Sequence, residues 1–173
     1  MSGSTKTIAL ALLPEFDQEM AGTRKTLERV PEAALGWKPH PKSYSMGDLA
    51  THVAHVPSWM SMTLEGDSFD VSPNGEPMRL PPATSVAELL ERFDRGAAEA
   101  RAALAKTTDQ TCLGSWALLA NGQTLFSMPR AAVVRSFVMS HLVHHRAQLT
   151  VYLRLNDVPV PALYGPSADE GGM

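Results

Sequence analysis

Apolar residues recur at intervals of three and four along four separate segments of the chain, and this periodicity limits the fold more than any other feature. Side chains at that spacing line one face of an α-helix, so each segment has one face to bury. Four amphipathic helices bury such faces most simply against one another. The sequence therefore predicts an all-α fold, a four-helix bundle built from residues of about 13–30, 45–60, 85–104 and 129–155.

Polar residues and a proline predict where some of these helices begin and end. Ser45 and Asp48 resemble a capping box at the start of the second segment, with Asp in place of the usual Glu. Ser85 and Glu88 have the spacing of a full capping box at the start of the third. Pro57 lies inside the second segment, so we expect a kink or an early end there.

Two connections between the helices carry their own signals. Residues 64–84 are rich in Gly, Pro and Asp and are too long for a simple bundle turn, and such loops tend to be functional. We expect this loop over or beside a site. Asn121-Gly122 lies between two short apolar arms, which predicts a small β-hairpin before the last helix. No internal repeat or linker interrupts the chain, so we expect residues 1–173 to form a single domain.

Composition excludes several classes of partner. The net charge is -3 and no Lys/Arg cluster is present, which argues against nucleic-acid binding. The only cysteine, Cys112, rules out an internal disulfide and a multi-cysteine zinc site, and we expect a buried thiol. No apolar run approaches the roughly 20 residues of a membrane span, and the first residues resemble a helix entry more than a signal peptide. The sequence predicts a cytoplasmic protein.

Three of the six histidines lie within five residues, in the stretch HLVHH that begins at His141. His141 and His145 are four residues apart, so they lie on one side of a helix. The apolar residues that precede His141 at the same spacing mark this side as facing the core. Two imidazoles at this spacing can bind one metal ion. His144 lies about 100° around the helix from His145, so we expect it beside the ligands or at an interface.

A third ligand is needed, because two nitrogens are too few for a zinc-like site. The second helix offers His52 and His55, and His52 lies close to the centre of its apolar stripe, whereas His55 lies about 100° away. We expect His52 to face His141 and His145. Three protein ligands with an open fourth position are typical of a catalytic metal site. The alternative is a hydrogen-bonded cluster of core histidines with no physiological metal.

Other polar residues near these histidines are candidates for supporting roles. Gln148 follows one turn beyond the second ligand and can orient a ligand, and Tyr152 can donate a proton. With His144, these two are the candidate catalytic residues. We expect Arg146 to form an ion pair on the surface or at a dimer interface. His40 lies in a loop from which it can reach the mouth of the site, although exposed loop histidines are usually solvated. The three tryptophans are interpreted as packing residues.

The end of the chain, HLVHHRAQLTVYLRLNDVPVPALYGPSADE, resembles the end of the DinB family, within the DinB/YfiT-like superfamily. The stretch GWKPHPKSYSMGDLATHVAHVPSW is similar to the family's Trp-Lys-Pro loop and second helix. The resemblance implies a four-helix bundle that binds zinc or nickel through three histidines, which fall on His52, His141 and His145. One departure is Ala147, where many members have Gly, and it concerns helix packing.

The resemblance also implies a function, because the superfamily includes thiol S-transferases that use low-molecular-weight thiols. It implies a metal-dependent enzyme of this type, with a small-molecule substrate and a homodimeric assembly. One alternative is a hydrolase that uses metal-bound water, whose pKa the ion lowers. Another is a non-catalytic, metal-binding or dimeric stress-response protein. For a three-histidine site, the affinity for the metal is expected to decrease as the pH falls below ~6.5, the ordinary pKa of histidine, because protonated imidazoles do not bind metal.

Overall fold

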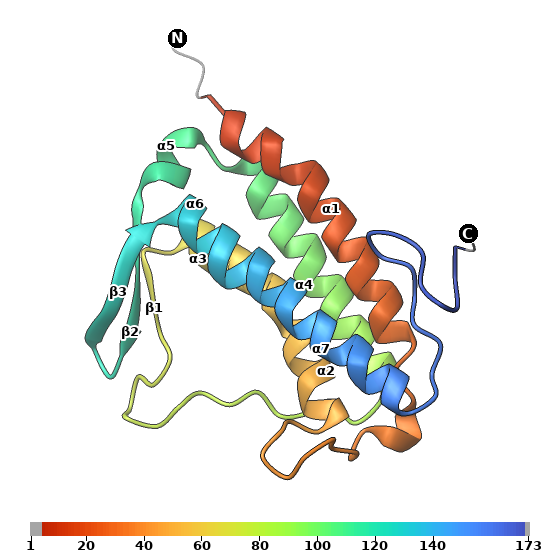
Figure 1. Cartoon of the computed structure of the whole chain (residues 1–173). Coiled ribbons are helices and arrows are strands. Elements are labelled where there is room, and N and C mark those ends of the chain that lie inside the picture. The colour runs from red at the N-terminus through yellow and green to blue at the C-terminus, as the bar shows by residue number, and fades with distance from the viewer. Residues whose placement is uncertain (1–4, 172–173) are drawn as a thin grey trace.

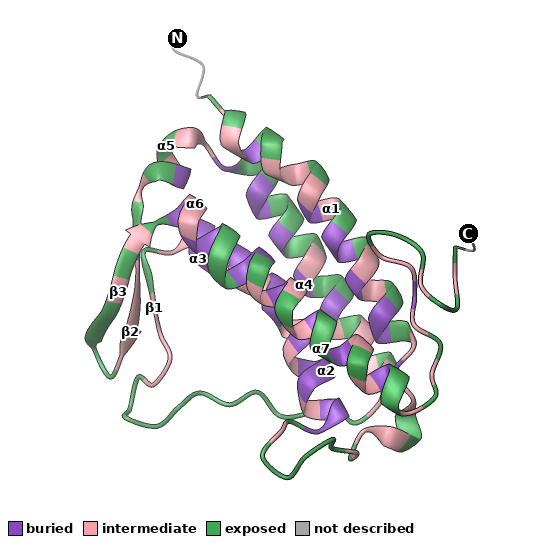
Figure 2. Cartoon of the chain, viewed as in Figure 1, coloured by how far each residue is buried: buried purple, intermediate pink, exposed green. Residues whose placement is uncertain are grey.

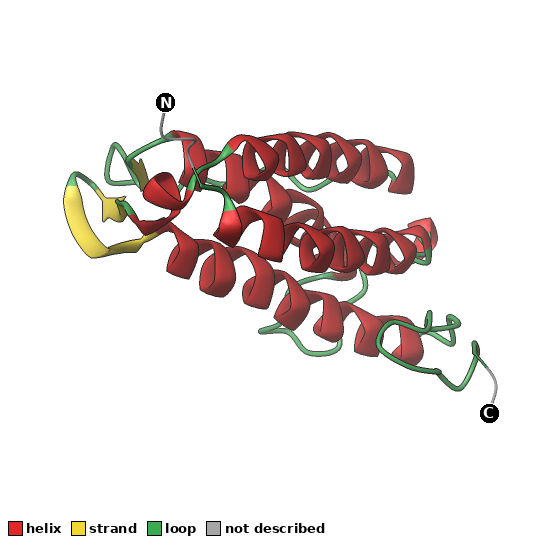
Figure 3. Ribbon diagram, turned by 90° about the horizontal axis from the view of Figure 1, so that it is seen from above, coloured by secondary structure: helices red, strands yellow, loops and turns green. Residues whose placement is uncertain are grey.

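The computed structural model describes residues 5–171, which form a mainly helical protein with a small three-stranded sheet at one end of the helices (Figures 1 and 3). In chain order the elements are α1 (Thr7–Glu28), η1 (Glu32–Ala34), α2 (Met46–His55), η2 (Val56–Ser58), α3 (Trp59–Glu65), β1 (Ser68–Asp70), α4 (Val86–Lys106), α5 (Asp109–Leu113), β2 (Ser115–Ala120), β3 (Gln123–Pro129), α6 (Arg130–Val133), η3 (Val134–Ser140) and α7 (His141–Leu155). In this described part of the chain, none of the helices is long and apolar enough to cross a membrane.

The core lies between the long helices, whose buried residues gather on their inward faces (Figure 2). Helix α1 packs on α4, while α2 contacts both α4 and α7. The stripe expected on the second segment is fully buried, with 0% exposure at Leu49, Val53, Val56 and Met60. The predicted helical character and the inward direction of this stripe are confirmed.

The two expected capping boxes have different outcomes. At α2, the Ser45 hydroxyl accepts a hydrogen bond from the Asp48 backbone, and the Asp48 carboxylate accepts one from the Ser45 backbone, as predicted. At α4, Ser85 accepts from the Glu88 backbone at 3.1 Å. The Glu88 carboxylate instead accepts from the Thr84 backbone nitrogen at 2.8 Å. The prediction of a full box at Ser85 was therefore wrong in its second half, because the carboxylate reaches one residue further back.

The second and fourth helical segments are both interrupted. Pro57 divides the second into α2, the 3₁₀ turn η2 and α3, as expected. The last segment runs through α6, η3 and α7 without a break in the chain of helical residues, and Asn156 follows it as predicted. However, η3 is a π-helix, seven residues long, that ends directly before His141. Such wider turns are rare and frequently occur at functional sites.

The small sheet has the strand order β1-β2-β3. Strands β2 and β3 are antiparallel and turn at Asn121 and Gly122, whose φ values of 49° and 74° suit a two-residue type I′ turn. The predicted hairpin is confirmed. The third strand, β1, belongs to the long loop after α3 and pairs with β2 in parallel. The Asp70 carboxylate holds this arrangement by accepting hydrogen bonds from the backbone nitrogens of Asn121 and Gly122.

The chain after α7 packs back against α1, where Tyr164 contacts a buried ion pair between α7 and α1. Arg146 is only 2% exposed, and its guanidinium donates to the Glu19 carboxylate at 2.6 Å and to the Thr23 hydroxyl at 3.1 Å. Tyr164, in the tail, donates to the same carboxylate at 2.8 Å. The prediction that Arg146 lies at the surface or at a dimer interface was wrong, because Glu19 supplies a buried partner from α1.

Cys112 is the only cysteine of the chain, and its side chain is buried in α5. Burial raises the pKa of this thiol, which keeps it protonated at neutral pH. The expectation of a buried thiol is confirmed.

Candidate metal centre

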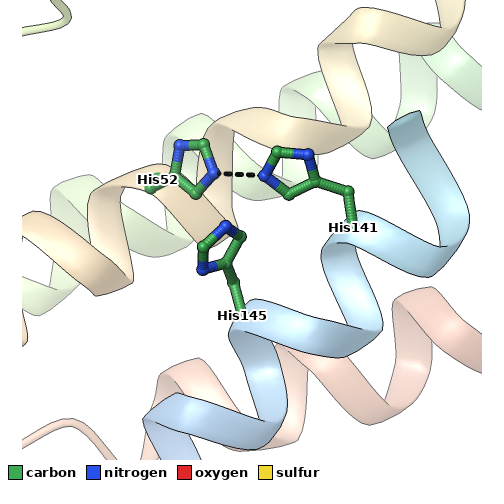
Figure 4. Close-up of side chains that lie close together, drawn as sticks. All are labelled: His52, His141 and His145. Carbon is green, nitrogen blue, oxygen red and sulfur yellow. Dashed lines mark hydrogen bonds between the residues drawn. The ribbon is translucent and has the colours of Figure 1, made fainter. Parts of the chain in front are cut away.

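Three half-buried imidazoles from two helices converge, His52 from α2 and His141 and His145 from α7 (Figure 4). Each offers one ring nitrogen, and the three nitrogens lie within 4.8 Å of one another. The Nε2 atoms of His52 and His141 are 2.9 Å apart. Nitrogen ligands around a tetrahedral zinc ion are roughly 3.3 Å apart. The three side chains therefore fit a metal ion with small adjustments of the rings.

Helix geometry explains why these residues meet. The spacing of four residues puts His141 and His145 on one side of α7, with ring centroids 4.6 Å apart. The packing of α2 on α7 brings the His52 ring to 5.0 Å from His141 and 4.5 Å from His145. The structure thus brings together the three residues that the sequence analysis selected, in an arrangement compatible with metal binding.

Burial keeps these imidazoles neutral. It lowers the pKa of His52 to about 4, with added repulsion from His145 and His141. The pKa of His141 is also lowered to about 4, by burial and then by repulsion from His145 and His144. Burial lowers the pKa of His145, partly offset by its hydrogen bond with Gln148. Neutral imidazoles have a free lone pair, which is the form that binds a metal.

Gln148 orients one of the three rings. Its Oε1 atom lies 2.8 Å from Nδ1 of His145, and its Nε2 atom lies 3.1 Å from Nε2 of His144. An amide oxygen can only accept, so His145 carries its proton on Nδ1 and leaves Nε2 free for a metal. His144 is exposed and does not belong to the group of three.

Tyr152 and His40 both form hydrogen bonds with the loop before α2, and His40 is itself part of that loop. The Tyr152 hydroxyl donates to the backbone oxygen of Tyr44 at 3.3 Å, and its ring lies edge-on to Trp37 at 5.4 Å. The imidazole of His40 accepts a hydrogen bond from the Lys42 backbone at 3.1 Å. Tyr152 therefore holds the loop in place beside the imidazoles, and His40 shapes a turn within it.

His55 lies apart from the three converging rings, as its place on the helix predicted. Its Nδ1 atom is 3.3 Å from the Ser58 hydroxyl. Its pKa is lowered by burial and then by the positive charge of Arg92. The side chain faces a cavity that also reaches His52.

Two aromatic residues surround the imidazoles and were not assigned to the site from the sequence. The Trp59 ring lies edge-on to His141 at 5.1 Å and to His52 at 5.6 Å. Tyr44 stacks on His52 with an interplanar angle of 23°. Trp59 follows His52 by seven residues, two helical turns, and this spacing was a usable signal. Tyr44 precedes the helix cap, where no periodicity applies.

Two cavities lie next to the imidazoles. The α2 cavity has a volume of about 690 Å³ and includes His52, His55 and residues 78–82 of the long loop. The α7 cavity has a volume of about 440 Å³ and includes His145, Gln148 and Tyr152. Tyr44 and Asp48 line both cavities. The long loop thus lies beside the candidate site, as expected, and both cavities offer space for a small molecule next to the imidazoles.

Comparisons with known proteins agree with this arrangement. The family model of the DinB superfamily matches residues 15–149. A DinB-like protein from Bacillus cereus ATCC 10987 has a similar structure, with a TM-score of 0.68 and 22% identity over 88% of this chain and 95% of that chain. A DinB-like protein from Bacillus subtilis gives a TM-score of 0.64 and 19% identity over 87% of this chain and 96% of that chain. These two structures share the fold. A comparison with curated proteins found no match.

Proposed function

The chain belongs to the DinB superfamily, and from this premise we propose that it binds zinc or nickel through His52, His141 and His145 and catalyses thiol transfer to a small molecule. The observation that carries the proposal is the convergence of three neutral imidazoles beside two open cavities. Nitrogen ligands suit both metals. Three protein ligands leave a position for a substrate.

The charge of the candidate ligands favours an anionic substrate group. Three neutral imidazoles carry no negative charge, so they do not compensate the positive charge of a divalent ion as a carboxylate ligand would. When bound there, a divalent metal lowers the pKa of a thiol and favours its anionic form at neutral pH. The side chains of the protein orient the candidate ligands: Gln148 fixes the His145 ring, and Trp59 packs against His52 and His141.

We further propose that residues 1–173 form one domain and that its helical part is a four-helix bundle. The first member is α1 and the second is α2 together with α3. The third is α4, and the fourth is η3 together with α7. The contacts of α1 with α4, of α2 and α3 with α4, and of α2 with α7 support this arrangement. The site then lies between two of these members, α2 and α7, as expected for a centre inside a bundle.

The proposed reaction is tested by comparing chelator-treated protein with protein reloaded with zinc or nickel. Each form is incubated with the thiol mercaptosuccinate and the electrophile 1-chloro-2,4-dinitrobenzene, and the loss of free thiol is followed. We expect thioether formation that requires the metal and is abolished in His145→Ala. Metal-dependent consumption of the electrophile without loss of thiol would contradict thiol transfer and favour hydrolysis.

A further inference from the structure

The two cavities beside the imidazoles differ in the chemistry of their walls. In the α2 cavity, one wall is formed by the loop residues Met78, Leu80, Pro81 and Pro82, which are largely apolar. Met78 is 61% exposed and Leu80 is 43% exposed, so these apolar side chains are accessible to a small molecule.

The α7 cavity is lined by the loop residues Lys38, Pro39, Lys42 and Ser43 and by Gln148 and Tyr152 of α7, so it has two basic side chains beside apolar ones. The backbone nitrogen of Ser43 donates to the His40 carbonyl at 2.9 Å, so the loop that carries both lysines is held by internal hydrogen bonds. The two cavities therefore differ in the loop side chains that line them, with His52 in one and His145 in the other.

Charge separates the two cavities further. Asp48 lines both of them, and its carboxylate also accepts a hydrogen bond from the Ser45 hydroxyl at 2.7 Å. In the α2 cavity, Arg79 balances this negative charge. In the α7 cavity, Lys38 and Lys42 together exceed it by one positive charge. Neither lysine takes part in the ion pairs found within residues 5–171.

Tyr44 is common to the two cavities. Its ring stacks on His52, and its backbone oxygen accepts the hydrogen bond of Tyr152 from α7. It lines both cavities and is 57% exposed, so its side chain is accessible to a ligand in either of them.

We propose that the cavities bind two different substrates, an anionic thiol in the α7 cavity and an apolar electrophile in the α2 cavity. This assignment rests on the proposed function, because thiol transfer needs two substrates. The thiol loses its proton to solvent, and its sulfur forms a bond to the electrophilic carbon. The bond from that carbon to its leaving group breaks, and the leaving group departs with the electron pair. Lys38 and Lys42 bind carboxylates of the thiol substrate, and Met78 and Leu80 contact the apolar substrate.

The test uses the full chain loaded with cobalt(II), whose absorption reports a bound thiolate. Mercaptosuccinate is the anionic thiol, 2-mercaptoethanol is the neutral thiol, and fluorescence of N-phenyl-1-naphthylamine reports apolar binding. The variants are Lys38→Gln/Lys42→Gln for the α7 cavity and Met78→Ser/Leu80→Ser for the α2 cavity. Lys25→Gln/Lys106→Gln, on α1 and α4, is the control for loss of two positive charges.

We expect Lys38→Gln/Lys42→Gln to weaken mercaptosuccinate binding about fivefold to tenfold, as suits two exposed charge interactions. Binding of 2-mercaptoethanol, of N-phenyl-1-naphthylamine and of cobalt should not change. Met78→Ser/Leu80→Ser should weaken only N-phenyl-1-naphthylamine, and the control should change nothing. Equal effects of both cavity variants on both classes of probe, or no effect of either, would overturn the assignment while leaving the metal site intact. Failure of the unaltered chain to bind cobalt would instead refute the proposed function itself.

Discussion

Gln148 connects two neighbouring imidazoles of α7, and only one of them belongs to the candidate metal centre. Because its amide oxygen fixes the His145 ring, we expect Gln148→Ala to weaken zinc binding roughly tenfold to a hundredfold without changing the stoichiometry. Isothermal titration calorimetry measures both. His144→Ala is the matched control, since it removes the other partner of the amide. A larger loss of affinity in His144→Ala than in Gln148→Ala would contradict this role.

Protonation of the candidate ligands gives a second prediction. In the metal-free chain, the pKa values of His52 and His141 are about 4, below the value of ~6.5 in an unfolded chain. The unfolded state then binds more protons between these values, so the free energy of unfolding decreases as pH falls from about 6.5 toward 4. Proton competition with the metal at these two residues is likewise expected well below pH ~6.5, lower than the sequence alone suggests.

NMR titration of the imidazole resonances in chelator-treated protein checks these values directly. We expect the resonances of His52 and His141 to change near pH 4. Midpoints near the ordinary histidine value of ~6.5 would show that partial burial does not lower the pKa of these two rings.

At the level of single residues, the sequence could predict what depends on one helix. The side of α7 that carries His141 and His145 follows from spacing alone, and the inward direction of His52 follows from its apolar stripe. The partner of Arg146 did not follow, because Glu19 lies 127 residues earlier in the chain. Spacing along one helix contains no information about such a pair.

Among the structural elements, α1, α7 and the tail are joined by the buried ion pair of Arg146 and Glu19. Removing one partner leaves a buried charge uncompensated, so we expect Arg146→Met to lower the free energy of unfolding by roughly 3–5 kcal/mol. Glu19→Leu combined with Arg146→Met should restore part of this loss, since no charge is then left alone. Urea denaturation of Arg146→Met, of Glu19→Leu and of the double variant measures the coupling. A double variant less stable than the sum of the single effects would contradict this explanation.

Two features of the secondary structure could not be predicted from sequence patterns. Hydrophobic periodicity predicted one helix from Pro129 to Leu155, but η3 adopts the wider π-helical turn within it. Val134 and Val138 of η3 are still buried, so the apolar pattern does not distinguish a π-helix from an α-helix. Strand β1 is only three residues long and pairs with a strand nearly 50 residues later, a register that local sequence does not specify.

Across the whole molecule, the candidate ligands join α2 to α7, which are far apart in the chain. A metal that binds the folded protein and not the unfolded one should therefore stabilise the entire fold. At a free zinc concentration of about 1,000 times Kd, the expected gain is about 4 kcal/mol, or roughly 8–16 °C in Tm for a chain of this size. Thermal unfolding followed by circular dichroism measures the shift. His145→Ala is the control and should show little of it, and an unaltered Tm in the wild-type chain would contradict a site of this kind.

The overall architecture is the part of the structure that could be predicted best from the sequence. The mainly helical fold and the hairpin at Asn121-Gly122 follow from periodicity and turn chemistry, and the resemblance to the DinB family is shown by the match over residues 15–149. The cavities could not be predicted, because their walls combine residues 38–44, 78–82 and α7. Their relative positions depend on how the loops pack and not on a local pattern.

Metal binding by five histidine variants tests the central claim most directly. Metal analysis and calorimetry with zinc and nickel are carried out on His52→Ala, His141→Ala, His145→Ala, His55→Ala and His144→Ala, each expressed without an affinity tag. We predict that the first three each lose tight binding, because two remaining nitrogens hold a metal poorly. The last two should keep a stoichiometry near one, with at most a roughly tenfold to hundredfold loss of affinity. If His144→Ala abolishes binding while His145→Ala retains it, the proposed metal centre is wrong.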